Sequence, residues 1–472
     1  MTATQMTQLH SEANHSPWKA CDLRGQYPES ISVELFRAVG SAIGTMLHHD
    51  ARVFVAGDFR LSTSDLKLAL IEGLMATGLS PLDGGQIPTP VAYFIGEHLG
   101  ADAILIVTAS HNPADHNGLK LMICGVPTTP EQLSSIRRLA ESAEFRTGTG
   151  VSEKIDLVAP YERSMIERWR HLDPKRFPHL VIDAGNGAWS EIAPRILRSL
   201  GFHVHCLSCV ADGSFPDRPS DCSRTENLAS LRAAVAAQPN ALGIAWDGDG
   251  DRVALIDETG SHVSTDEISI LLARDALRGR DLQTRIVVDI KLSDGVRREI
   301  LAHGGVPLLE RTGHAFVRGR MIAEDALLGL DACGHYFHRE LHGGDDGLFS
   351  TLLMLDLLQR SGQSLAALRR TLPAIFSTPE LRVPTSLVSF QDASERLQSA
   401  LPATEIISVD GLRFVLQDGI VLIRASGTEP VVSLRIEGAD STSLCSLLEQ
   451  CLGALPTAEL FLRDQLAKQS EL

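Results

Sequence analysis

The sequence predicts an α/β fold of three similar domains, with mixed sheets covered by helices, followed by a smaller C-terminal α+β domain. Short apolar runs typical of buried strands alternate with stretches of helical apolar spacing. This cycle of strand, Gly/Asp-rich loop and helix recurs after roughly 100 to 110 residues, and such alternation favours sheets covered by helices. After about residue 375, short strand-like segments follow one another instead. The predicted fold class rests on these three observations.

The first repeat contains alternating helices and strands. Its apolar periodicity predicts a helix over 33–48, a strand over 52–56, helices near 63–77 and 91–99, and a strand over 103–107. Glycine and aspartate predict turns at 83–85 and 115–118 and a loop at Arg24-Gly25. A polar stretch near 126–155 separates this repeat from the next.

The second and third repeats follow the same alternation. The predicted elements are strands over 179–183, 203–205, 241–246 and 285–289, and helices near 189–200, 227–237 and 266–278. Residues 210–226 are rich in Asp, Ser, Pro and Gly, which predicts a long loop. Ser264 and Glu267 have the spacing of a capping box at the start of the last helix.

The C-terminal region is expected to form an antiparallel sheet. Its short strands are predicted over 405–408, 412–416, 420–424 and 431–437. Asp410-Gly411 and Asp418-Gly419 between them are typical of hairpin turns. The expected organisation is a polar tail over 1–17 and four domains over 18–155, 156–262, 263–374 and 375–472.

Composition narrows the classes of function. The chain has 472 residues and a formal net charge of −16, and it contains no long basic cluster, which argues against nucleic acid or an anionic membrane as a partner. No uncharged apolar run approaches the ~20 residues of a membrane helix, and the first seventeen residues lack the apolar core of a signal peptide. The eight scattered cysteines fit reduced thiols and a cytoplasmic location. Cys206 and Cys209 have redox-like spacing, but no second pair exists to complete a zinc site.

The stretch Thr-Ala-Ser-His-Asn-Pro, residues 108–113, directly follows the apolar run 103–107. Pro113 bars direct continuation of the strand, so Ser110 is expected on a tight loop at a strand's carboxyl end, where ligands bind in open α/β sheets. His111 is adjacent and Lys120 follows soon after. A hydroxyl beside an imidazole and an ammonium suits a nucleophile or a phosphate carrier, and a capped turn is the alternative.

Three carboxylates, Asp247, Asp249 and Asp251, alternate with glycines directly after a predicted strand. The glycines permit a curl that draws the carboxylates together, and such a group requires a hard divalent cation, for which Mg²⁺ is suited. A calcium EF-hand loop is the rival interpretation, but Arg252 occupies the position that requires glycine. A solvated acidic turn is the other alternative.

Further polar clusters fall in predicted loops. Residues 311–314, 331–335 and 343–347 each combine glycine with charged or histidine side chains. The segment 424–430, Arg-Ala-Ser-Gly-Thr-Glu-Pro, offers a guanidinium, two hydroxyls and backbone N–H groups, which suits a phosphate.

Taken in order, the Ser110 loop, the Asp247–Asp251 turn with Arg252 and the 424–430 loop resemble the α-D-phosphohexomutases, most of all the bacterial phosphomannomutase/phosphoglucomutase branch. The resemblance runs from about Trp18 to Glu437. It implies four domains around a central cleft, the fourth closing on the substrate. It also implies an intramolecular phosphotransferase that interconverts hexose 1- and 6-phosphates of mannose or glucose through an enzyme phosphoserine, primed by a hexose 1,6-bisphosphate.

The resemblance assigns a role to individual residues. Ser110 would be the phosphoserine and would join Asp247, Asp249 and Asp251 in binding Mg²⁺. His111, Lys120, Arg252 and Lys291 would line the reacting centre, with Lys120 or His335 as the general acid/base. The expected substrate-binding residues are Arg24, Lys291, His314, Asp331, Cys333, Arg424, Ser426, Gly427, Thr428 and Arg435.

The chain departs from the family in its sugar-binding loop. Asp331 and Cys333 stand where glutamate and serine are usual, and Cys21 stands where tyrosine is usual. Asp is one methylene shorter than Glu, and a thiol is a weaker hydrogen-bonding group than a hydroxyl. Recognition of the sugar therefore stays open, with phosphoglucosamine mutase as a second enzyme and a non-catalytic sugar-phosphate binding homologue as the rival of another class. Hexose phosphates are the expected partners of a monomer or dimer.

Overall fold

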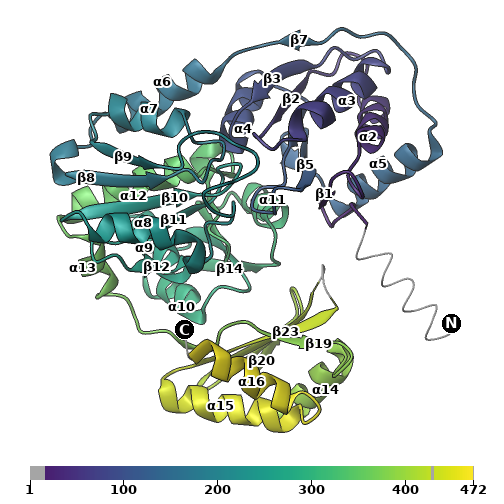
Figure 1. The fold of residues 1–472 in the computed structure, drawn as a ribbon. Coiled ribbons are helices and arrows are strands. Elements are labelled where there is room, and N and C mark those ends of the chain that lie inside the picture. The colour runs from purple at the N-terminus through teal and green to yellow at the C-terminus, as the bar shows by residue number, and fades with distance from the viewer. Residues whose placement is uncertain (1–15, 427–429, 471–472) are drawn as a thin grey trace.

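The computed structural model describes residues 16–426 and 430–470, and its strands form four β-sheets (Figure 1). We refer to the units built on these sheets as domains 1 to 4. Three are α/β domains and the last is a smaller C-terminal domain, which confirms the predicted fold class. The sequence-based boundaries between them stay predictions, and the one between residues 262 and 263 falls inside β12 (His262–Val263). Except for its last two residues, the polar tail expected over 1–17 lies outside the described residues.

Domain 1 has a mixed sheet in the order β1-β5-β4-β2-β3-β7, with β6 on β5. Its central strands are parallel, and β5 runs antiparallel between β4 and β1. The elements are β1 (Leu23–Gln26), α2 (Val33–Met46), β2 (Val53–Gly57), α3 (Thr63–Met75), β3 (Leu82–Gln86), α4 (Thr89–His98), β4 (Ala103–Val107), β5 (His116–Ile123), β6 (Val126–Pro127), α5 (Pro130–Ser142) and β7 (Glu153–Lys154).

Three predicted turns or loops of domain 1 are wrong. Residues 24–25, 83–85 and 116–118 belong to β1, β3 and β5. Gly84 and Gly118 serve close packing between strands instead of turning the chain. A Cβ at Gly84 would lie 2.4 Å from the Phe54 ring, and one at Gly118 would lie 2.1 Å from the carbonyl oxygen of Leu23. Both contacts are too short for any larger residue.

Domain 2 has the sheet order β12-β11-β10-β8-β9, and β8, β9 and β10 are parallel. Its elements are α6 (Val158–Trp169), η1 (Pro174–Arg176), β8 (His179–Asp183), α7 (Ile192–Ser199), β9 (Val204–Leu207), η2 (Thr225–Leu228), α8 (Ala229–Ala236), β10 (Ala241–Trp246), β11 (Val253–Ile256) and β12. The predicted strands and helices are present, and the long loop expected over 210–226 contains no strand or helix before η2 begins.

Domain 3 has the sheet order β14-β13-β15-β16-β17. Its elements are α9 (Thr265–Leu277), β13 (Arg285–Asp289), α10 (Asp294–Ala302), β14 (Val306–Glu310), α11 (His314–Glu324), β15 (Leu328–Leu330), β16 (Tyr336–His338), η3 (Arg339–Leu341), β17 (Gly344–Asp345), α12 (Gly347–Ser361) and α13 (Leu365–Arg369). The capping box predicted for α9 is confirmed, with Ser264 and Glu267 each bonded to the other's backbone N–H.

Domain 4 is antiparallel, in the order β18-β23-β22-β21-β20 with β19 also on β23. Its elements are β18 (Phe376–Ser377), β19 (Leu381–Pro384), α14 (Phe390–Ala400), β20 (Glu405–Ile407), β21 (Leu412–Leu416), β22 (Gly419–Ala425), β23 (Val431–Gly438), α15 (Ser441–Ala454) and α16 (Glu459–Ser470). The two predicted hairpin turns are confirmed by the pairing of β21 with β20 and β22.

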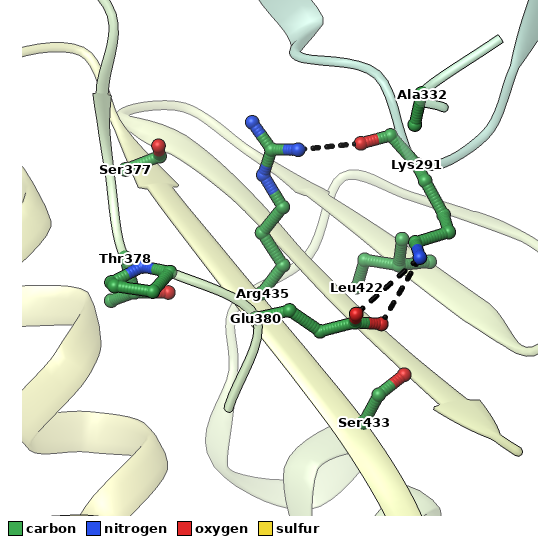
Figure 2. A pocket seen from close by; sticks show the side chains of 9 residues that line it. Lys291, Ala332, Ser377, Thr378, Glu380, Leu422, Ser433 and Arg435 are labelled. Carbon is green, nitrogen blue, oxygen red and sulfur yellow. Dashed lines mark hydrogen bonds and ion pairs between the residues drawn. The ribbon is translucent and has the colours of Figure 1, made fainter. Parts of the chain in front are cut away.

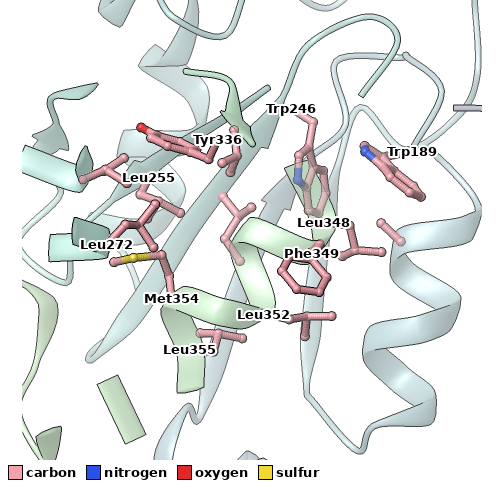
Figure 3. Packing of buried hydrophobic residues seen from close by; sticks show 14 of the residues in the cluster. Trp189, Trp246, Leu255, Leu272, Tyr336, Leu348, Phe349, Leu352, Met354 and Leu355 are labelled. Atoms are coloured by element: carbon pink, nitrogen blue, oxygen red, sulfur yellow. The ribbon is translucent and has the colours of Figure 1, made fainter. Parts of the chain in front are cut away.

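One apolar core runs through domains 1, 2 and 3, and domain 4 has a separate core. Helix α12 of domain 3 lies against domain 2, where Leu348, Phe349 and Leu352 pack near Trp189 and Trp246 (Figure 3). The loops that follow the strands of the first three sheets are therefore held close together. Among the described helices, none combines the length and the apolar character that a bilayer crossing requires.

Candidate active site

Ser110 lies just beyond the carboxyl end of β4 and is 1% exposed. Its φ of 51° places it in the left-handed region, which is unusual for a residue other than glycine. Its N–H donates to Thr108 Oγ1 (2.9 Å), and its hydroxyl donates to Asp247 Oδ2 (2.8 Å). The backbone therefore turns the Ser110 side chain toward domain 2.

The aspartate turn follows β10 and is folded tightly against the Ser110 loop. Asp247 Oδ1 accepts the N–H groups of Gly250 (3.1 Å) and Arg252 (3.2 Å), which closes the turn. A Cβ at Gly248 would lie 2.6 Å from the carbonyl oxygen of Ser110. Only glycine at this position lets the two loops approach so closely.

The carboxylates of Asp247, Asp249 and Asp251 are buried, and each offers an oxygen within 4.8 Å of the others. Within the described part of the chain, Asp249 Oδ1 and Asp251 Oδ1 are buried without a hydrogen-bond partner. Buried polar atoms are normally paired, so two orphaned carboxylate oxygens facing a third carboxylate fit a divalent cation with oxygen ligands.

The EF-hand interpretation does not fit the fold. Residues 253–256 form β11, and Glu258, which would close such a loop, accepts the N–H of Ala366 instead (3.2 Å).

Lys120 is a buried ammonium at the centre of the site. It lies on β5 opposite Ile106 of β4, and its Nζ donates to Asp249 Oδ2 (2.8 Å) and to Asp251. Burial alone would lower the pKa of Lys120, but the two aspartates raise that pKa well above its usual value. Burial would likewise raise the pKa of Asp249, and the charge and hydrogen bond of Lys120 more than offset this effect. Burial and then its two carboxylate neighbours raise the pKa of Asp247.

His335 is hydrogen-bonded at both ring nitrogens. Its Nε2 accepts from Arg252 Nε (2.9 Å), and its Nδ1 lies 2.6 Å from Asp345 Oδ2. Since arginine only donates, Nε2 is unprotonated and Nδ1 carries the proton that Asp345 accepts. Burial lowers the pKa of His335 in spite of the opposing charges of Asp251 and Asp331, so the imidazole is neutral.

Three more predicted residues surround this centre. His111 Nδ1 is 3.3 Å from Ser110 Oγ, and burial followed by the charge of Arg252 lowers the pKa of His111 well below its usual value. Arg24 donates to the carbonyl oxygen of Ala109 (3.1 Å) and pairs with Asp22. His314, the first residue of α11, stacks on His335 at a centroid distance of 6.3 Å.

The predicted sugar loop turns back on itself. Asp331 Oδ1 accepts the N–H groups of Cys333 (2.8 Å) and His335 (2.9 Å), and the side chain is buried. Burial raises the pKa of Asp331, and burial together with Asp331 raises that of Cys333 to about 11, so Cys333 is a neutral thiol. One oxygen of Asp331 is thus committed to holding the loop.

The remaining predicted residues lie in or against domain 4. Lys291 Nζ is 3.3 Å from Glu380, and Arg435 donates to the carbonyl oxygen of Lys291 (2.7 Å) beside a pocket of about 400 Å³ (Figure 2). Arg435 also pairs with Asp266 (3.0 Å) and Glu437 (3.3 Å). Arg435 therefore ties domain 4 to domain 3, a contact that its expected role in phosphate binding does not explain.

The predicted phosphate loop, residues 424–430, is only partly described. Arg424 pairs with Asp410, and the N–H of Ser426 donates to the carbonyl oxygen of Val431 (3.0 Å). Gly427 and Thr428 lie outside the described residues. The structure thus brings Ser110, His111, Lys120, the aspartates, Arg252 and His335 together, while the hydrogen bonds described for Arg413, Arg435 and Glu437 of domain 4 run to domain 3.

Several functional contacts were not predicted. Thr89 donates to Asp249 Oδ2 (2.8 Å), Thr108 Oγ1 lies 3.2 Å from the same oxygen, and Asp345 orients His335. Thr108 directly follows a strand, which is a weak signal of a site residue. Thr89 opens a helix and Asp345 lies in the glycine-rich stretch 343–347, and nothing in their local sequence indicates the partner.

Comparison with known proteins gives consistent matches along the chain. Models of the phosphoglucomutase/phosphomannomutase α/β/α domains I, II and III match residues 18–147, 161–260 and 264–376, and the model of the C-terminal domain matches 380–452. A Pseudomonas aeruginosa phosphomannomutase/phosphoglucomutase is 33% identical over 427 residues, covering 89% of this chain and 91% of that protein. A Neisseria gonorrhoeae phosphoglucomutase is also 33% identical, covering 89% and 92%. A crystal structure of a phosphoglucomutase/phosphomannomutase family protein from Burkholderia thailandensis superposes with a TM-score of 0.85 at 32% identity, covering 95% and 98%.

Proposed function

This chain belongs to the phosphoglucomutase/phosphomannomutase family, and from that premise we propose that it interconverts the 1- and 6-phosphates of glucose and mannose through a phosphoserine at Ser110. The observation that carries the proposed site is the contact of Ser110 Oγ with Asp247, 2.8 Å apart, at the meeting point of domains 1 and 2.

In the proposed reaction, the phosphoryl group leaves Ser110 Oγ as its O–P bond breaks, and a new O–P bond forms to a free hydroxyl of the hexose monophosphate. The proton of that hydroxyl passes to a base. The resulting 1,6-bisphosphate turns over in the site and returns its other phosphoryl group to Ser110. The hydroxyl that is released takes the proton back, so the chemistry balances over one cycle. A hexose 1,6-bisphosphate therefore primes an unphosphorylated chain.

Cationic side chains of this protein would neutralise the negative charge that accumulates at the site during phosphoryl transfer. A phosphoserine and three aspartates bring several negative charges together, and catalysis of this step depends on positioning and charge compensation. Lys120 and Arg252 already contact these aspartates. Lys291 lies on the domain 4 side, where its ammonium is paired with Glu380.

Asp247, Asp249 and Asp251 would hold Mg²⁺, which fits the two orphaned oxygens of the turn and supplies positive charge beside the transferring phosphoryl group. Removal of divalent cations with EDTA should abolish turnover, and added Mg²⁺ should restore it. Full activity in EDTA would contradict this ligand set.

Of the two bases expected from the sequence, the geometry favours His335. Lys120 is held as an ammonium between two carboxylates, whereas His335 is neutral and keeps its acceptor nitrogen toward the site. A movement of Arg252 toward the substrate phosphate would release Nε2 to accept the hydroxyl proton. His335 would then serve as base in one direction and acid in the other.

The distal phosphate is assigned to domain 4. Arg424 and Ser426, with Gly427 and Thr428, would grip whichever phosphate is not reacting, so one cationic loop serves both orientations of the bisphosphate. Arg24, His314, Asp331 and Cys333 would line the sugar, and His111 would lie at the reacting centre beside Ser110 Oγ. We also propose a cytoplasmic location, since the eight cysteines are unpaired. Gel filtration would decide between monomer and dimer.

The central test is Ser110→Ala, assayed with glucose 1-phosphate and a trace of glucose 1,6-bisphosphate. Turnover should fall by more than about 10³-fold because the phosphoryl carrier is removed. Wild-type protein incubated with the bisphosphate should gain the mass of one phosphate at Ser110, and the variant should gain none. Wild-type rates in the variant would exclude the mechanism, and an inactive wild type that still binds hexose phosphates would identify a non-catalytic homologue.

Sugar preference requires a separate comparison. One carboxylate oxygen of Asp331 accepts two N–H groups of its own loop, so it is already occupied and the sequence does not identify the preferred sugar. Rates on mannose, glucose and glucosamine phosphates should be measured under the same conditions. A preference for glucosamine phosphate would replace the proposed substrates while leaving the Ser110 chemistry unchanged.

A further inference from the structure

Arg60 lies in the loop between β2 and α3 and is 1% exposed. No part of the mechanism above uses it. Its guanidinium points beneath the loop that carries Ser110, so its contacts decide whether it serves only the packing of domain 1.

The guanidinium donates to four backbone carbonyl oxygens of one short segment. Nη2 donates to the carbonyl oxygens of Ser110 (2.7 Å) and Asn112 (2.6 Å). Nη1 donates to those of Pro113 (2.5 Å) and His116 (2.9 Å). The planar fork of arginine can reach four acceptors in this way, and the compact ammonium of lysine cannot reproduce that geometry.

A second layer fixes Arg60 itself. Its Nε donates to Asp58 Oδ2 (3.2 Å), and Asp58 also accepts from Thr63 and Thr108, the same Thr108 that accepts the N–H of Ser110. On the other side, Arg60 lies 5.1 Å from the centroid of the Phe215 ring, which comes from the long loop of domain 2. Arg60 thus joins the serine loop to both domains that form the site.

The serine loop needs such support because its backbone is strained. A left-handed conformation is disfavoured for a residue other than glycine and persists only where the surroundings hold it. Phosphoryl transfer also depends on alignment, since a displacement of about 1 Å can cost about 10²-fold in rate. The carbonyl of Ser110, which Arg60 fixes, belongs to the residue whose hydroxyl must face Asp247.

We propose that Arg60 is a positioning residue for phosphoryl transfer, which sets the direction of the Ser110 hydroxyl by gripping four carbonyl groups of residues 110–116. The kinetic test of this inference rests on the proposed function. The second test, which measures how firmly the backbone of residues 110–116 is held, does not depend on that function.

The test compares Arg60→Lys with Arg146→Lys. Arg146 is a matched control because its guanidinium also donates to backbone carbonyl oxygens of domain 1, those of Thr77 (3.0 Å) and Leu47 (2.8 Å), away from the serine loop. Arg60→Lys should lower kcat at least about tenfold and leave KM within about threefold, because the contacts to the substrate remain. Single-turnover transfer of phosphate from glucose 1,6-bisphosphate to Ser110 should slow by the same factor. Arg146→Lys should lower the melting temperature but keep kcat within about twofold.

Hydrogen exchange of the peptide covering 108–118 gives a readout that needs no activity. Exchange there should accelerate in Arg60→Lys and stay unchanged in Arg146→Lys. Asp58→Asn, which keeps the four carbonyl contacts but weakens their support, should show a smaller change of the same kind and replaces Arg60→Lys if that variant does not fold.

Two results would overturn the inference. One is unchanged kcat and unchanged loop exchange in the Arg60 variant. The other is an equal loss of kcat in Arg146→Lys, which would show that Arg60 contributes only to the stability of domain 1. An inactive wild type would instead refute the proposed function, and the exchange comparison would still decide the role of Arg60.

Discussion

At the scale of single residues, the position of one proton in the site is fixed by two neighbours of His335. Arg252 can only donate to Nε2, so the proton stays on Nδ1 and is held by Asp345. The imidazole of His335 is thereby held in the tautomer whose Nε2 is free of a proton and can accept one in the proposed transfer. In the proposed reaction, Asp345 would therefore be a positioning residue that acts through His335.

Asp345→Asn should lower kcat by about 10²-fold with KM within about threefold, because it removes the charge that orients and stabilises the imidazole during proton transfer. Steady-state kinetics at saturating Mg²⁺ would measure the effect. Asp346→Asn is the control, since Asp346 caps α12 and accepts from Tyr161 without touching His335. Equal losses in the two variants would count against a specific role for Asp345.

The residues of the site could be predicted where they are contiguous in the sequence. Ser110 and the three aspartates each belong to a short motif whose chemistry can be recognised from the sequence alone. The structure places Ser110 in contact with Asp247 and groups the three carboxylates. Asp345, Thr89 and Arg60 could not be predicted, because each meets its partner only when distant segments fold together. Arg435 illustrates a different difficulty. Its position near the 424–430 motif suggested phosphate binding, but in the structure its guanidinium contacts Asp266 of domain 3.

At the scale of elements, β16 and α12 bury a histidine that is neutral in the folded state near neutral pH. His338 is 3% exposed, its Nε2 contacts Ser350 Oγ (2.9 Å), and its ring lies against Phe349. Burial, with a smaller contribution from Arg168, lowers the pKa of His338 to about 3. In the unfolded chain the usual value is about 6.5.

Because the pKa is depressed on folding, the unfolded state binds more protons between about pH 6.5 and pH 3, and stability falls as the pH falls through that window. His338→Gln should therefore lose about 2 kcal/mol less unfolding free energy than wild type between pH 7 and pH 5. Urea unfolding at both pH values measures this difference, with the exposed His49→Gln as control. Identical acid sensitivity in wild type and His338→Gln would refute the assignment.

The central strands could be predicted because buried strands appear as unbroken apolar runs, as in β4 and β10, whereas helices α10 to α16 were not predicted. The errors come from residues with two possible uses. Glycines of β3 and β5 looked like turns but serve close packing. Helix α5 was missed within its polar stretch because only Leu133 and Ile136 are buried along it, so little periodicity marks it.

At the scale of the whole molecule, charged groups fix domain 4 on domain 3. Arg413 donates to the carbonyl oxygen of Ile290 (2.9 Å) and pairs with Asp294 (2.9 Å), while Glu437 accepts from Ser293 (3.0 Å). Arg435 adds its contacts with Asp266 and the backbone of Lys291. The placement of the predicted phosphate loop, residues 424–430, relative to Ser110 thus depends on an interface of polar, largely buried groups.

Arg435→Met should weaken this interface by about 3 kcal/mol, because it removes the cation that pairs with the carboxylates of Asp266 and Glu437. Calorimetry should show a lower melting temperature together with a higher KM. Arg424→Met, which removes a pair within domain 4, should raise KM without the loss of stability. If Arg435→Met raised KM without changing the melting temperature, the result would indicate that Arg435 binds the substrate phosphate directly.

The packing of α12 against domain 2 also bears on how the protein is made. Strand β10 leaves the ribosome about a hundred residues before α12 does, so an apolar sheet face stays uncovered on the nascent chain in the meantime. At typical translation rates that interval lasts on the order of ten seconds, long enough for chaperones to bind and for proteolysis of stalled chains to detect the exposure.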